Sequence, residues 1–341
     1  MSKEIIFGID FGINYSYVAY TNAEGKTECI KNAEGEKSTP SVIYFDSGNF
    51  RIVGEKAKHY SVTEPEKTVF QIKRELGTDY RRNICGSQYS PEELTAIILM
   101  ELVKDANNRL KEQGIIADRD EVNKVVIACP AYYGFAEKNV LKAAGEIAGL
   151  EVLDLIIEPV AAVICNNYLN ENCNRKRILV YDLGGSSFDV SIIDCDENNL
   201  ELVGADGDVN LDGKDWDEAT VKALCKKWQE ENNSLEDINE YTSDLLNKTI
   251  QITDKCIETV KAKDSADIDE ILLVGGSALM PQVKELLEDY YKIPVLMSEP
   301  DEMIAKGTAI YGNKYLQNYE YNDSFEPKNN FVVAVYGPPQ E

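Results

Sequence analysis

The sequence predicts an α/β protein built from two lobes of similar design. Two stretches, 5–20 and 177–193, share one order of residues: an apolar run, an aspartate, a glycine turn and a second apolar run. A repeated order within one chain indicates a repeated structural unit. Apolar strands alternate with amphipathic helices after each stretch, as in α/β folds. The 341 residues exceed what one simple core needs and suit two lobes.

The stretch 177–193 predicts a hairpin with the chemistry of an anion site. Its first strand ends near Asp182, and Gly184 and Gly185 form the turn, because glycine adopts backbone angles that other residues avoid. Such a turn can present bare N–H groups to an anion, and Asp182 could hold a cation bound to that anion. This pairing suits a magnesium nucleotide. The alternative for the motif alone is an ordinary sheet hairpin whose aspartate caps the turn.

The N-terminal stretch repeats this order, with Asp10 at the end of an apolar run and Gly12 in the turn. Two such hairpins suggest two lobes that close on one phosphate chain. The elements that follow in the first lobe are a strand at 39–45, a helix from 55, a helix at 94–110 capped by Ser90 and Glu93, a strand at 124–128 that ends before Pro130, and a helix at 135–150.

Two charged residues in the first lobe have open alternatives. Lys73 lies in the partly apolar segment 68–77, where a lysine is usually a surface charge and otherwise a point cation that reaches a phosphate. Glu158 lies between an apolar strand and a helix that begins with Pro159. It is either a helix N-cap, for which glutamate is a poor choice, or a carboxylate that orients a water.

The second lobe continues after the central hairpin with less regular patterns. A strand that enters the glycine turn Gly275-Gly276-Ser277, followed by a helix from Pro281, predicts another anion or sugar site. The other expected elements are a turn-rich segment at 201–213, a helix at 216–228, a polar stretch at 229–245, a helix at 246–260, a short strand from 294 and a helix from 300 to 315.

The composition excludes several classes of protein. A net charge of −25 repels phosphate backbones and anionic lipid headgroups, so we expect neither nucleic acid nor a membrane as partner. Hydrophobic residues at 43% are enough for packed interiors. The eight cysteines include no Cys-x-x-Cys pair and His59 is the only histidine, so structural zinc is not expected. Because neither a signal peptide nor an apolar run that could span a bilayer is evident, we expect the protein to be located in the reducing cytoplasm.

Taken in order, these stretches resemble the ATPase domain of the seventy-kilodalton heat-shock (DnaK-like) chaperones, within the actin and sugar-kinase superfamily. The resemblance covers roughly residues 4–316, and its most similar pieces are 52–58, 72–74, 144–152, 157–162, 181–185 and 271–277. It implies two ribonuclease-H-like (actin-like ATPase) lobes around a nucleotide cleft. The implied domains are lobe I at 1–174, lobe II at 175–301 with a shortened outer subdomain at about 214–267, a helix at 302–318 that returns to lobe I, and a linker or truncated segment at 319–341.

The resemblance also implies roles for individual residues. Asp10 and Asp182 would hold Mg²⁺ through waters, and Lys73 would approach the γ-phosphate of ATP. Glu158, Pro130 and Asp189 would organise the attacking water and couple the lobes, so that Lys73, Glu158, Asp182 and Asp189 are the candidate catalytic residues. The other candidate contacts of ATP or ADP are Gly12, Ile13, Asn14, Tyr15, Gly184, Gly185, Ser186, Ser187, Gly213, Gly275, Gly276, Ser277, Leu279 and Asp301.

The sequence departs from the family at several of these positions. Ile13 and Asn14 stand where the family has two threonines, so a hydroxyl near the γ-phosphate is missing. If that hydroxyl stabilises the transition state, its loss costs roughly 2.7–4 kcal/mol. Ser186 replaces the third glycine of the central turn, whereas Ser187 keeps the family's hydroxyl. Leu279 replaces an arginine, which removes a cation–π contribution of about 0.5–2 kcal/mol.

Two larger parts of the family pattern have no counterpart. The interval 216–268 is far shorter than in the family, and no helix-and-sheet subdomain that grips the adenosine is evident. The family's substrate-binding β-domain is absent from the chain as given. The leading hypothesis is a chaperone-like ATPase with reduced hydrolysis that binds Mg-ATP between two lobes and switches co-chaperone or client proteins. The alternatives are a non-catalytic actin-fold scaffold and a filament-forming actin relative; a sugar kinase is disfavoured because no polar sugar-binding insertion is evident.

Overall fold

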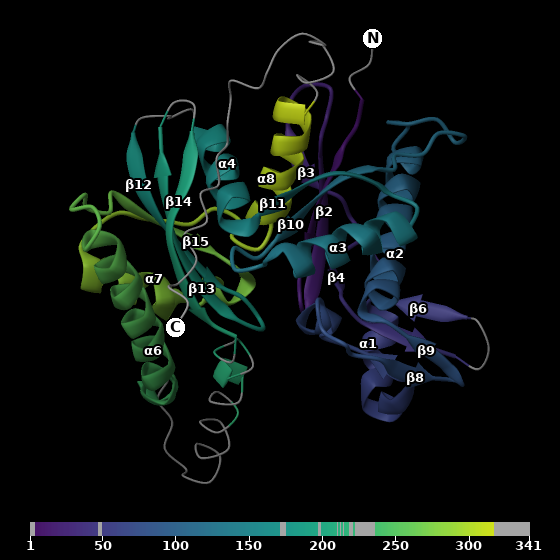
Figure 1. Cartoon of the computed structure of the whole chain (residues 1–341), viewed down its shortest axis with the longest axis horizontal. Coiled ribbons are helices and arrows are strands. Elements are labelled where there is room, and N and C mark those ends of the chain that lie inside the picture. The colour runs from purple at the N-terminus through teal and green to yellow at the C-terminus, as the bar shows by residue number, and fades with distance from the viewer. Residues whose placement is uncertain are drawn as a thin grey trace. The chain divides into compact units, whose positions relative to one another are not determined.

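A computed structural model describes the fold, and in it the chain forms two compact units (Figure 1). The described residues are 4–46, 50–170, 175–196, 199–209, 211, 213, 215–217, 221 and 236–316. Within them, the first unit contains the residues up to Cys165 and the segment from Ile304 onward. The second unit contains Asn166 to Met303. The first division falls inside helix α4 (Glu158–Asn170), and the second falls next to the first residue of α8 (Met303–Tyr311).

The first unit is built on a mixed sheet. Its hairpin β1–β2 is antiparallel, and two further strands run parallel to β1 on its other side. The strand order is β11 (Glu151–Ile157), β10 (Lys124–Cys129), β1 (Phe7–Phe11), β2 (Tyr15–Thr21) and β3 (Thr27–Cys29), with β4 (Ser38–Pro40) also paired to β2.

The sheet of the second unit has the same topology. A three-strand antiparallel meander again lies beside two strands that run parallel to its first member. The order is β14 (Leu200–Asp208), β13 (Phe188–Cys195), β12 (Lys176–Leu183), β15 (Glu270–Val274) and β16 (Val295–Leu296). In both sheets the aspartate of the hairpin, Asp10 or Asp182, occupies the next-to-last position of the first strand. The repeat predicted from the two hairpins is therefore confirmed.

Helices cover the first sheet as the periodicity predicts. They are α2 (Pro91–Glu112), α3 (Phe135–Ile147), the start of α4 and, from the far end of the chain, α8, whereas α1 (Glu55–Thr63) packs mainly against a smaller sheet of strands β5 (Ile43–Phe45), β6 (Arg51–Val53) and β7 (Thr68–Val69). The capping box is present, because Ser90 Oγ accepts a hydrogen bond from Glu93 N at 3.3 Å and Ser90 N donates to Glu93 Oε2 at 2.8 Å. Two small sheets complete the unit. One has the order β6, β5 and β7, and the other pairs β8 (Arg82–Ile84) with β9 (Ser87–Tyr89).

Helix α8 packs against the first sheet so closely that side chains are excluded at two positions. A methyl group at Gly8 of β1 would overlap with the backbone of Ala309. A methyl group at Gly307 of α8 would overlap with the carbonyl oxygen of Ala161 on α4. Tyr311 Oη also donates a hydrogen bond to Asp154 Oδ2 of β11 at 2.6 Å. These contacts fix the end of the described chain to the unit in which the chain begins.

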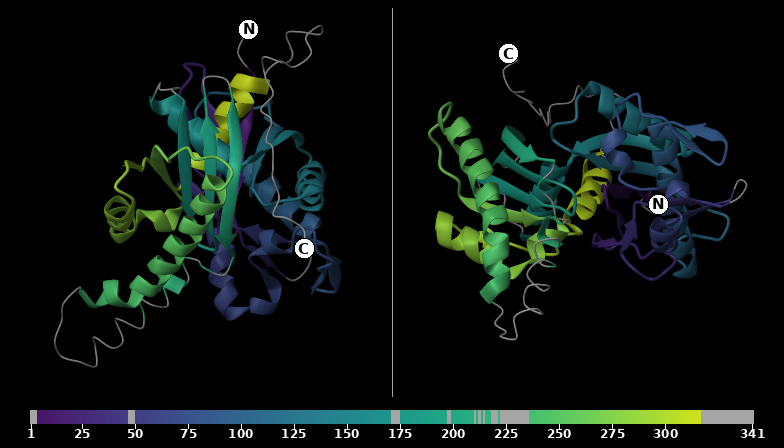
Figure 2. Two further views of the ribbon diagram at one scale, coloured as in Figure 1. Left: turned by 60° about the vertical axis from the view of Figure 1, so that its left-hand side comes forward. Right: turned by 90° about the horizontal axis from the view of Figure 1, so that it is seen from below.

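In the second unit, helix α6 (Glu236–Lys261) lies over β13 and β14, next to α7 (Pro281–Tyr291) (Figures 1 and 2). A common apolar core joins these elements, with Leu179, Phe188 and Leu273 completely buried. The hydroxyls of Tyr290 and Tyr291 donate to the two oxygens of Asp254, which ties the end of α7 to α6.

Three sequence predictions about elements were wrong. The segment 201–213 was expected to be turn-rich, but most of it is strand β14, where Gly204 and Gly207 allow close approach to Val260 and Phe188. The strand expected at 39–45 is two strands, β4 and β5, in different sheets. The helix expected from Leu246 begins at Glu236.

Several predictions fall on residues that the structure does not describe. Of the helix expected at 216–228, only 216–217 and 221 are described, and all are helical. Much of the expected outer subdomain, at 218–220 and 222–235, and the segment 319–341 lie outside the described residues. No helix in the described part of the chain combines the length and apolarity that a membrane crossing requires.

Candidate functional site

The first unit brings together three of the predicted site residues, Asp10, Lys73 and Glu158. Lys73 lies on the 3₁₀ helix η2 (Ile72–Glu75), and Glu158 is the first residue of α4, directly after β11. Lys73 Nζ donates a hydrogen bond to Glu158 Oε1 at 2.7 Å, across 85 residues of sequence. The two side chains are only 6% and 12% exposed. Two charged residues that were predicted separately therefore form a buried ion pair, with Lys73 in η2 and Glu158 at the start of α4.

The charges of Glu158 and Lys73 both act on the carboxyl group of Asp10. Desolvation and the negative charge of Glu158 raise the pKa of Asp10 from 3.8 to about 7, against the opposing effect of Lys73. Burial lowers the pKa of Lys73, but Glu158, Tyr133 and Asp10 raise it further, so the ammonium stays charged. Two carboxyl groups thus share one ammonium. A further cation at this site would relieve the electrostatic cost at Asp10, and carboxylate oxygens are the donors that Mg²⁺ prefers.

Two residues that the sequence analysis did not single out lie next to Lys73. Gln71, immediately before η2, has a φ of 58°, in the left-handed region that non-glycine residues rarely adopt. Tyr133 is buried, and its Oη donates a hydrogen bond to the carbonyl oxygen of Lys73 at 3.1 Å. Tyr133 in turn follows Pro130, whose carbonyl accepts from Tyr133 N at 3.2 Å. Pro130 is thus connected to Lys73 through Tyr133.

The first glycine turn, Gly12 to Asn14, joins β1 to β2. A side chain at Gly12 would overlap with the carbonyl oxygen of Tyr15, so the turn needs glycine there. Tyr15 opens β2 with 40% of its surface exposed, and its Oη accepts a hydrogen bond from Lys58 Nζ of α1 at 2.6 Å. The turn therefore offers the backbone groups of Gly12, Ile13 and Asn14, and the residue after it, Tyr15, binds the Lys58 ammonium through its Oη.

The second glycine turn, Gly184 to Ser187, joins β12 to β13 in the second unit. Gly184 N donates to the carbonyl oxygen of Ser187 at 3.0 Å and closes the turn. Ser187 Oγ donates to Asp189 Oδ2 at 2.9 Å, and Asp189 pairs in register with Asp182 on the neighbouring strand. Ser186 is buried. The turn thus has an aspartate on each of its two strands.

Two further glycines predicted as nucleotide contacts lie against this turn. Gly213 N donates to the carbonyl oxygen of Gly184 at 3.3 Å. A methyl group at Gly213 would come within 2.6 Å of Ser277 Oγ and 3.2 Å of the Cα of Gly185. Gly275 has a φ of +88°, and a methyl group there would come within 2.5 Å of Asp182 Oδ1. Six predicted residues from three separate segments therefore form one side-chain-poor surface: Asp182, Gly184, Gly185, Gly213, Gly275 and Ser277.

The remaining candidates lie at the border of this surface. Gly276 and Leu279 are on the 3₁₀ helix η3 (Gly276–Leu279), and Leu279 is 52% exposed. No atom of another part of the described chain lies within 4 Å of where a Gly276 side chain would start. Asp301 follows Pro300, whose carbonyl oxygen accepts from Gly275 N at 2.9 Å. The second unit thus gathers its predicted contacts by backbone hydrogen bonds.

Comparison with known proteins gives the family. A family model described as Hsp70 protein matches residues 6–85, 81–239 and 233–323. The chain is 32% identical to proteins named Chaperone protein DnaK from Thermotoga neapolitana, over 361 residues, and from Thermosipho africanus, over 360 residues. These alignments cover 90% of this chain and 59% and 58% of the two relatives. The chain therefore spans about three fifths of the length of these curated relatives. The chain therefore belongs to the Hsp70 family.

Proposed function

We propose that this chain is the nucleotide-binding part of an Hsp70-type chaperone, which binds Mg-ATP and Mg-ADP, hydrolyses ATP slowly and switches protein partners. The observation that carries the proposal is the repeated hairpin, which has an aspartate and a glycine turn at equivalent places in two sheets of one topology. Membership of the Hsp70 family supports it. Expected partners are adenine nucleotide and co-chaperone or client proteins.

The residues of both hairpins fit a magnesium nucleotide. Asp10 and Asp182 end their strands beside glycine turns and would hold Mg²⁺ through waters. The raised pKa of Asp10 supports a site that gains from added positive charge. When bound, the metal would neutralise part of the charge that builds up on the phosphates during transfer. Gly213 and Gly275 pack closely against Ser277 and Asp182, and the open space beside Gly276 would let the ribose and phosphates approach this backbone.

The ion pair suggests how water and phosphate are handled. Without nucleotide, Glu158 holds the ammonium of Lys73. A γ-phosphate is a stronger partner for that ammonium, because it carries more charge than a carboxylate. Lys73 would then move its hydrogen bonds to the phosphate, and Glu158 would become free to accept one from the attacking water. Asp189, hydrogen-bonded to Ser187, would help to hold that water and link the second turn to the reaction.

Slow hydrolysis follows from the first turn. Ile13 and Asn14 offer no hydroxyl, so the turn can contribute only its backbone groups and the Asn14 amide. If a hydroxyl stabilises the transition state in relatives, its absence raises the barrier by roughly 2.7–4 kcal/mol. We therefore expect phosphate release at about a hundredth to a thousandth of the rate of a relative that has the hydroxyl.

A non-catalytic scaffold is the second candidate. The half-exposed Leu279, in place of an arginine, and Ile13 favour it. The buried pair of Lys73 and Glu158 disfavours it, since two buried charges are costly and an apolar pair of similar volume would stabilise a scaffold equally well.

Calorimetric titration with Mg-ATP and Mg-ADP, together with a phosphate-release assay, tests the proposal. The wild type should bind both nucleotides and release phosphate slowly. Lys73→Met should bind nucleotide but release no phosphate, whereas the control Lys67→Met, in the partly exposed pair with Glu64, should behave as wild type. Absence of binding at millimolar nucleotide would exclude the proposal and favour the scaffold.

A further inference from the structure

The first glycine turn is held by a residue outside its own hairpin, Ser41. Ser41 Oγ donates a hydrogen bond to the carbonyl oxygen of Gly12 at 2.8 Å. Ser41 N donates to the carbonyl oxygen of Asn14 at 2.8 Å. Because the hydroxyl proton of Ser41 is used on Gly12, the 2.9 Å contact between its oxygen and Ser16 Oγ has Ser16 as donor. Ser41 thus holds both ends of the turn, and it is 1% exposed.

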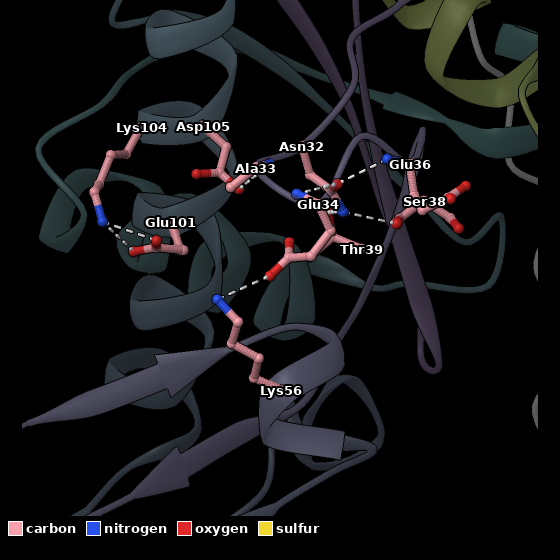
Figure 3. Close-up of polar contacts among 10 residues, drawn as sticks. All are labelled: Asn32, Ala33, Glu34, Glu36, Ser38, Thr39, Lys56, Glu101, Lys104 and Asp105. Atoms are coloured by element: carbon pink, nitrogen blue, oxygen red, sulfur yellow. Dashed lines mark hydrogen bonds and ion pairs between the residues drawn. The ribbon is translucent and has the colours of Figure 1, made fainter. Parts of the chain in front are cut away.

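The segment that carries Ser41 is itself fixed by the side chain of Asn32. Asn32 Nδ2 donates to the carbonyl oxygen of Ser38 at 3.0 Å and to Thr39 Oγ1 at 3.1 Å (Figure 3). Both acceptors lie on β4, next to Ser41. One amide group therefore connects a surface turn to the strand that ends beside the turn Gly12 to Asn14.

The surface turn has its own supports in two helices. Asn32 Oδ1 accepts hydrogen bonds from the backbone N–H groups of Glu34 and Glu36 at 3.1 and 3.0 Å (Figure 3). Ala33 N donates to Asp105 Oδ2 of α2 at 3.1 Å, and Glu34 Oε1 lies 3.8 Å from Lys56 Nζ of α1. The turn at 32–36 thus rests on α1 and α2 and holds β4 from there.

The chain contains a second turn of nearly the same sequence that lacks this connection. Residues 22–26 read Asn-Ala-Glu-Gly-Lys and residues 32–36 read Asn-Ala-Glu-Gly-Glu. In the first turn, Asn22 Oδ1 also accepts from the N–H groups two and four residues ahead, at 3.1 and 2.9 Å. The glycines have a φ of 85° and 88°. Among the described contacts, the side chain of Asn22 bonds only within its own turn. Asn22 therefore closes a turn without a link to β4, whereas Asn32 does both, and a comparison of the two distinguishes these roles.

We propose that Asn32 and Ser41 are positioning residues that hold the turn Gly12 to Asn14 in the geometry required to bind phosphate. This inference rests on the proposed function, because it takes the turn to be a phosphate site. A turn without a hydroxyl side chain depends on where its backbone groups point, and Ser41 fixes the carbonyl groups of that backbone. Pre-ordering the turn removes the entropic cost of ordering it when nucleotide binds.

Ser41→Ala tests the inner part of this arrangement. In nucleotide-free protein, amide hydrogen exchange should become about tenfold faster at residues 12–15, because the turn loses a hydrogen bond. The dissociation constants of Mg-ATP and Mg-ADP should rise about three- to tenfold, whereas that of adenosine, which has no phosphate, should not change. The control Thr21→Val, on the same strand β2, removes the part-buried contact between the hydroxyls of Thr21 and Thr27 without touching the turn.

Asn32→Asp and Asn22→Asp test the outer part as a matched pair. Each substitution keeps the oxygen that closes its turn and adds one negative charge, but only the change at Asn32 removes donors to β4. We expect Asn32→Asp to speed exchange at residues 12–15 and to weaken Mg-ADP binding about threefold, and Asn22→Asp to change neither.

The outcomes are separable from those of the proposed function. Unchanged exchange at residues 12–15 in Ser41→Ala, or equal effects of Ser41→Ala and Thr21→Val, would overturn the inference. Equal weakening of adenosine and Mg-ADP would also overturn it, since a general loss of structure would then explain the result. If the wild type binds no nucleotide, the proposed function fails, and the exchange comparison alone decides whether Asn32 and Ser41 hold the turn.

Discussion

Lys73 of η2 and Glu158 at the start of α4 form a buried ion pair, with 2.7 Å between Nζ and Oε1 across 85 residues of sequence. Removal of one partner leaves a charge in a site that is nearly closed to solvent. Breaking such a pair costs about 3–5 kcal/mol. We therefore expect Lys73→Met and Glu158→Gln each to lower the free energy of unfolding by roughly this amount, as measured by urea denaturation without nucleotide.

The double variant distinguishes pairing from a general effect of either residue. The double variant Lys73→Met with Glu158→Gln should lose clearly less unfolding free energy than the sum of the two single losses. It removes both charges of the pair, so that neither partner is left behind alone. The exposed pair of Lys104 and Glu101, at 2.8 Å, is the control and should show a coupling below about 0.5 kcal/mol. Additive single effects at Lys73 and Glu158 would contradict the pairing.

Asp10 should make the first unit less stable as pH rises. Its pKa is about 7 in the folded protein and 3.8 as the ordinary value, so between about pH 4 and 7 the folded state keeps a proton that the unfolded state has lost. Stability from this group is therefore highest at low pH, falls through this window and is constant above it. Asp10→Asn should gain stability relative to wild type from pH 4 to 7 in urea titrations.

The control for this pH dependence is Asp120→Asn, at an exposed position. It should run parallel to wild type over the same range. A constant difference between Asp10→Asn and wild type from pH 4 to 7 would show that the Asp10 carboxyl does not titrate there.

Arg177 should contribute strongly to the stability of the second unit. Its guanidinium donates to both oxygens of Asp194 at 2.6 and 2.7 Å, to Asp264 at 2.7 Å and to the carbonyl oxygen of Ala266 at 3.0 Å. Because it is buried and makes charge-assisted bonds, Arg177→Lys should cost about 2 kcal/mol by loss of the bidentate geometry. The hydrogen bond from Arg177 also lowers the pKa of Asp264, which should rise in the variant when followed by carboxyl NMR.

For comparison, Arg109→Lys removes a guanidinium from an exposed pair with Glu112. It should change the unfolding free energy by less than about 0.5 kcal/mol. An equal cost at both arginines would mean that the bonds of Arg177 add little to stability.

Gly307→Ala should disrupt the packing of α8. The added methyl group would overlap with the backbone of Ala161, and a helix backbone cannot move away as a flexible side chain can. We expect a loss of about 3 kcal/mol or more in thermal or urea unfolding. Gly134→Ala is the control, because its methyl group would meet only the mobile carboxylate of Glu137 at 3.2 Å, and it should cost under about 1 kcal/mol. Similar stabilities of the two variants would contradict this account of α8.

Local patterns in the sequence predicted much of the fold. The hairpins at Asp10 and Asp182 were recognised because glycine, aspartate and apolar runs recur in one order. Helix α2 was recognised because Ser90 and Glu93 have the spacing of a capping box at a helix N-terminus. Strand β14 was missed because Gly204 and Gly207 suggest turns. In the structure they mark places where the strand meets Val260 and Phe188, and such contacts have no local signature.

The same limit applies to the site. Lys73 and Glu158 were proposed from a family resemblance, since 85 residues separate them and no periodicity joins them. Tyr133, Ser41 and Asn32 were not proposed at all. Each bonds to a backbone carbonyl or a hydroxyl of another segment, and a single tyrosine, serine or asparagine in a sequence does not reveal which group it will meet.

The most direct test of the central claim is calorimetric titration of Mg-ADP into wild type, Asp10→Asn and Asp182→Asn, each with Mg²⁺ and with a chelator. We predict one site per chain in the wild type, at least tenfold weaker binding without Mg²⁺, and little remaining dependence on Mg²⁺ in either variant. Wild-type binding that is equally tight with chelator, or no binding at millimolar Mg-ADP, would contradict the account.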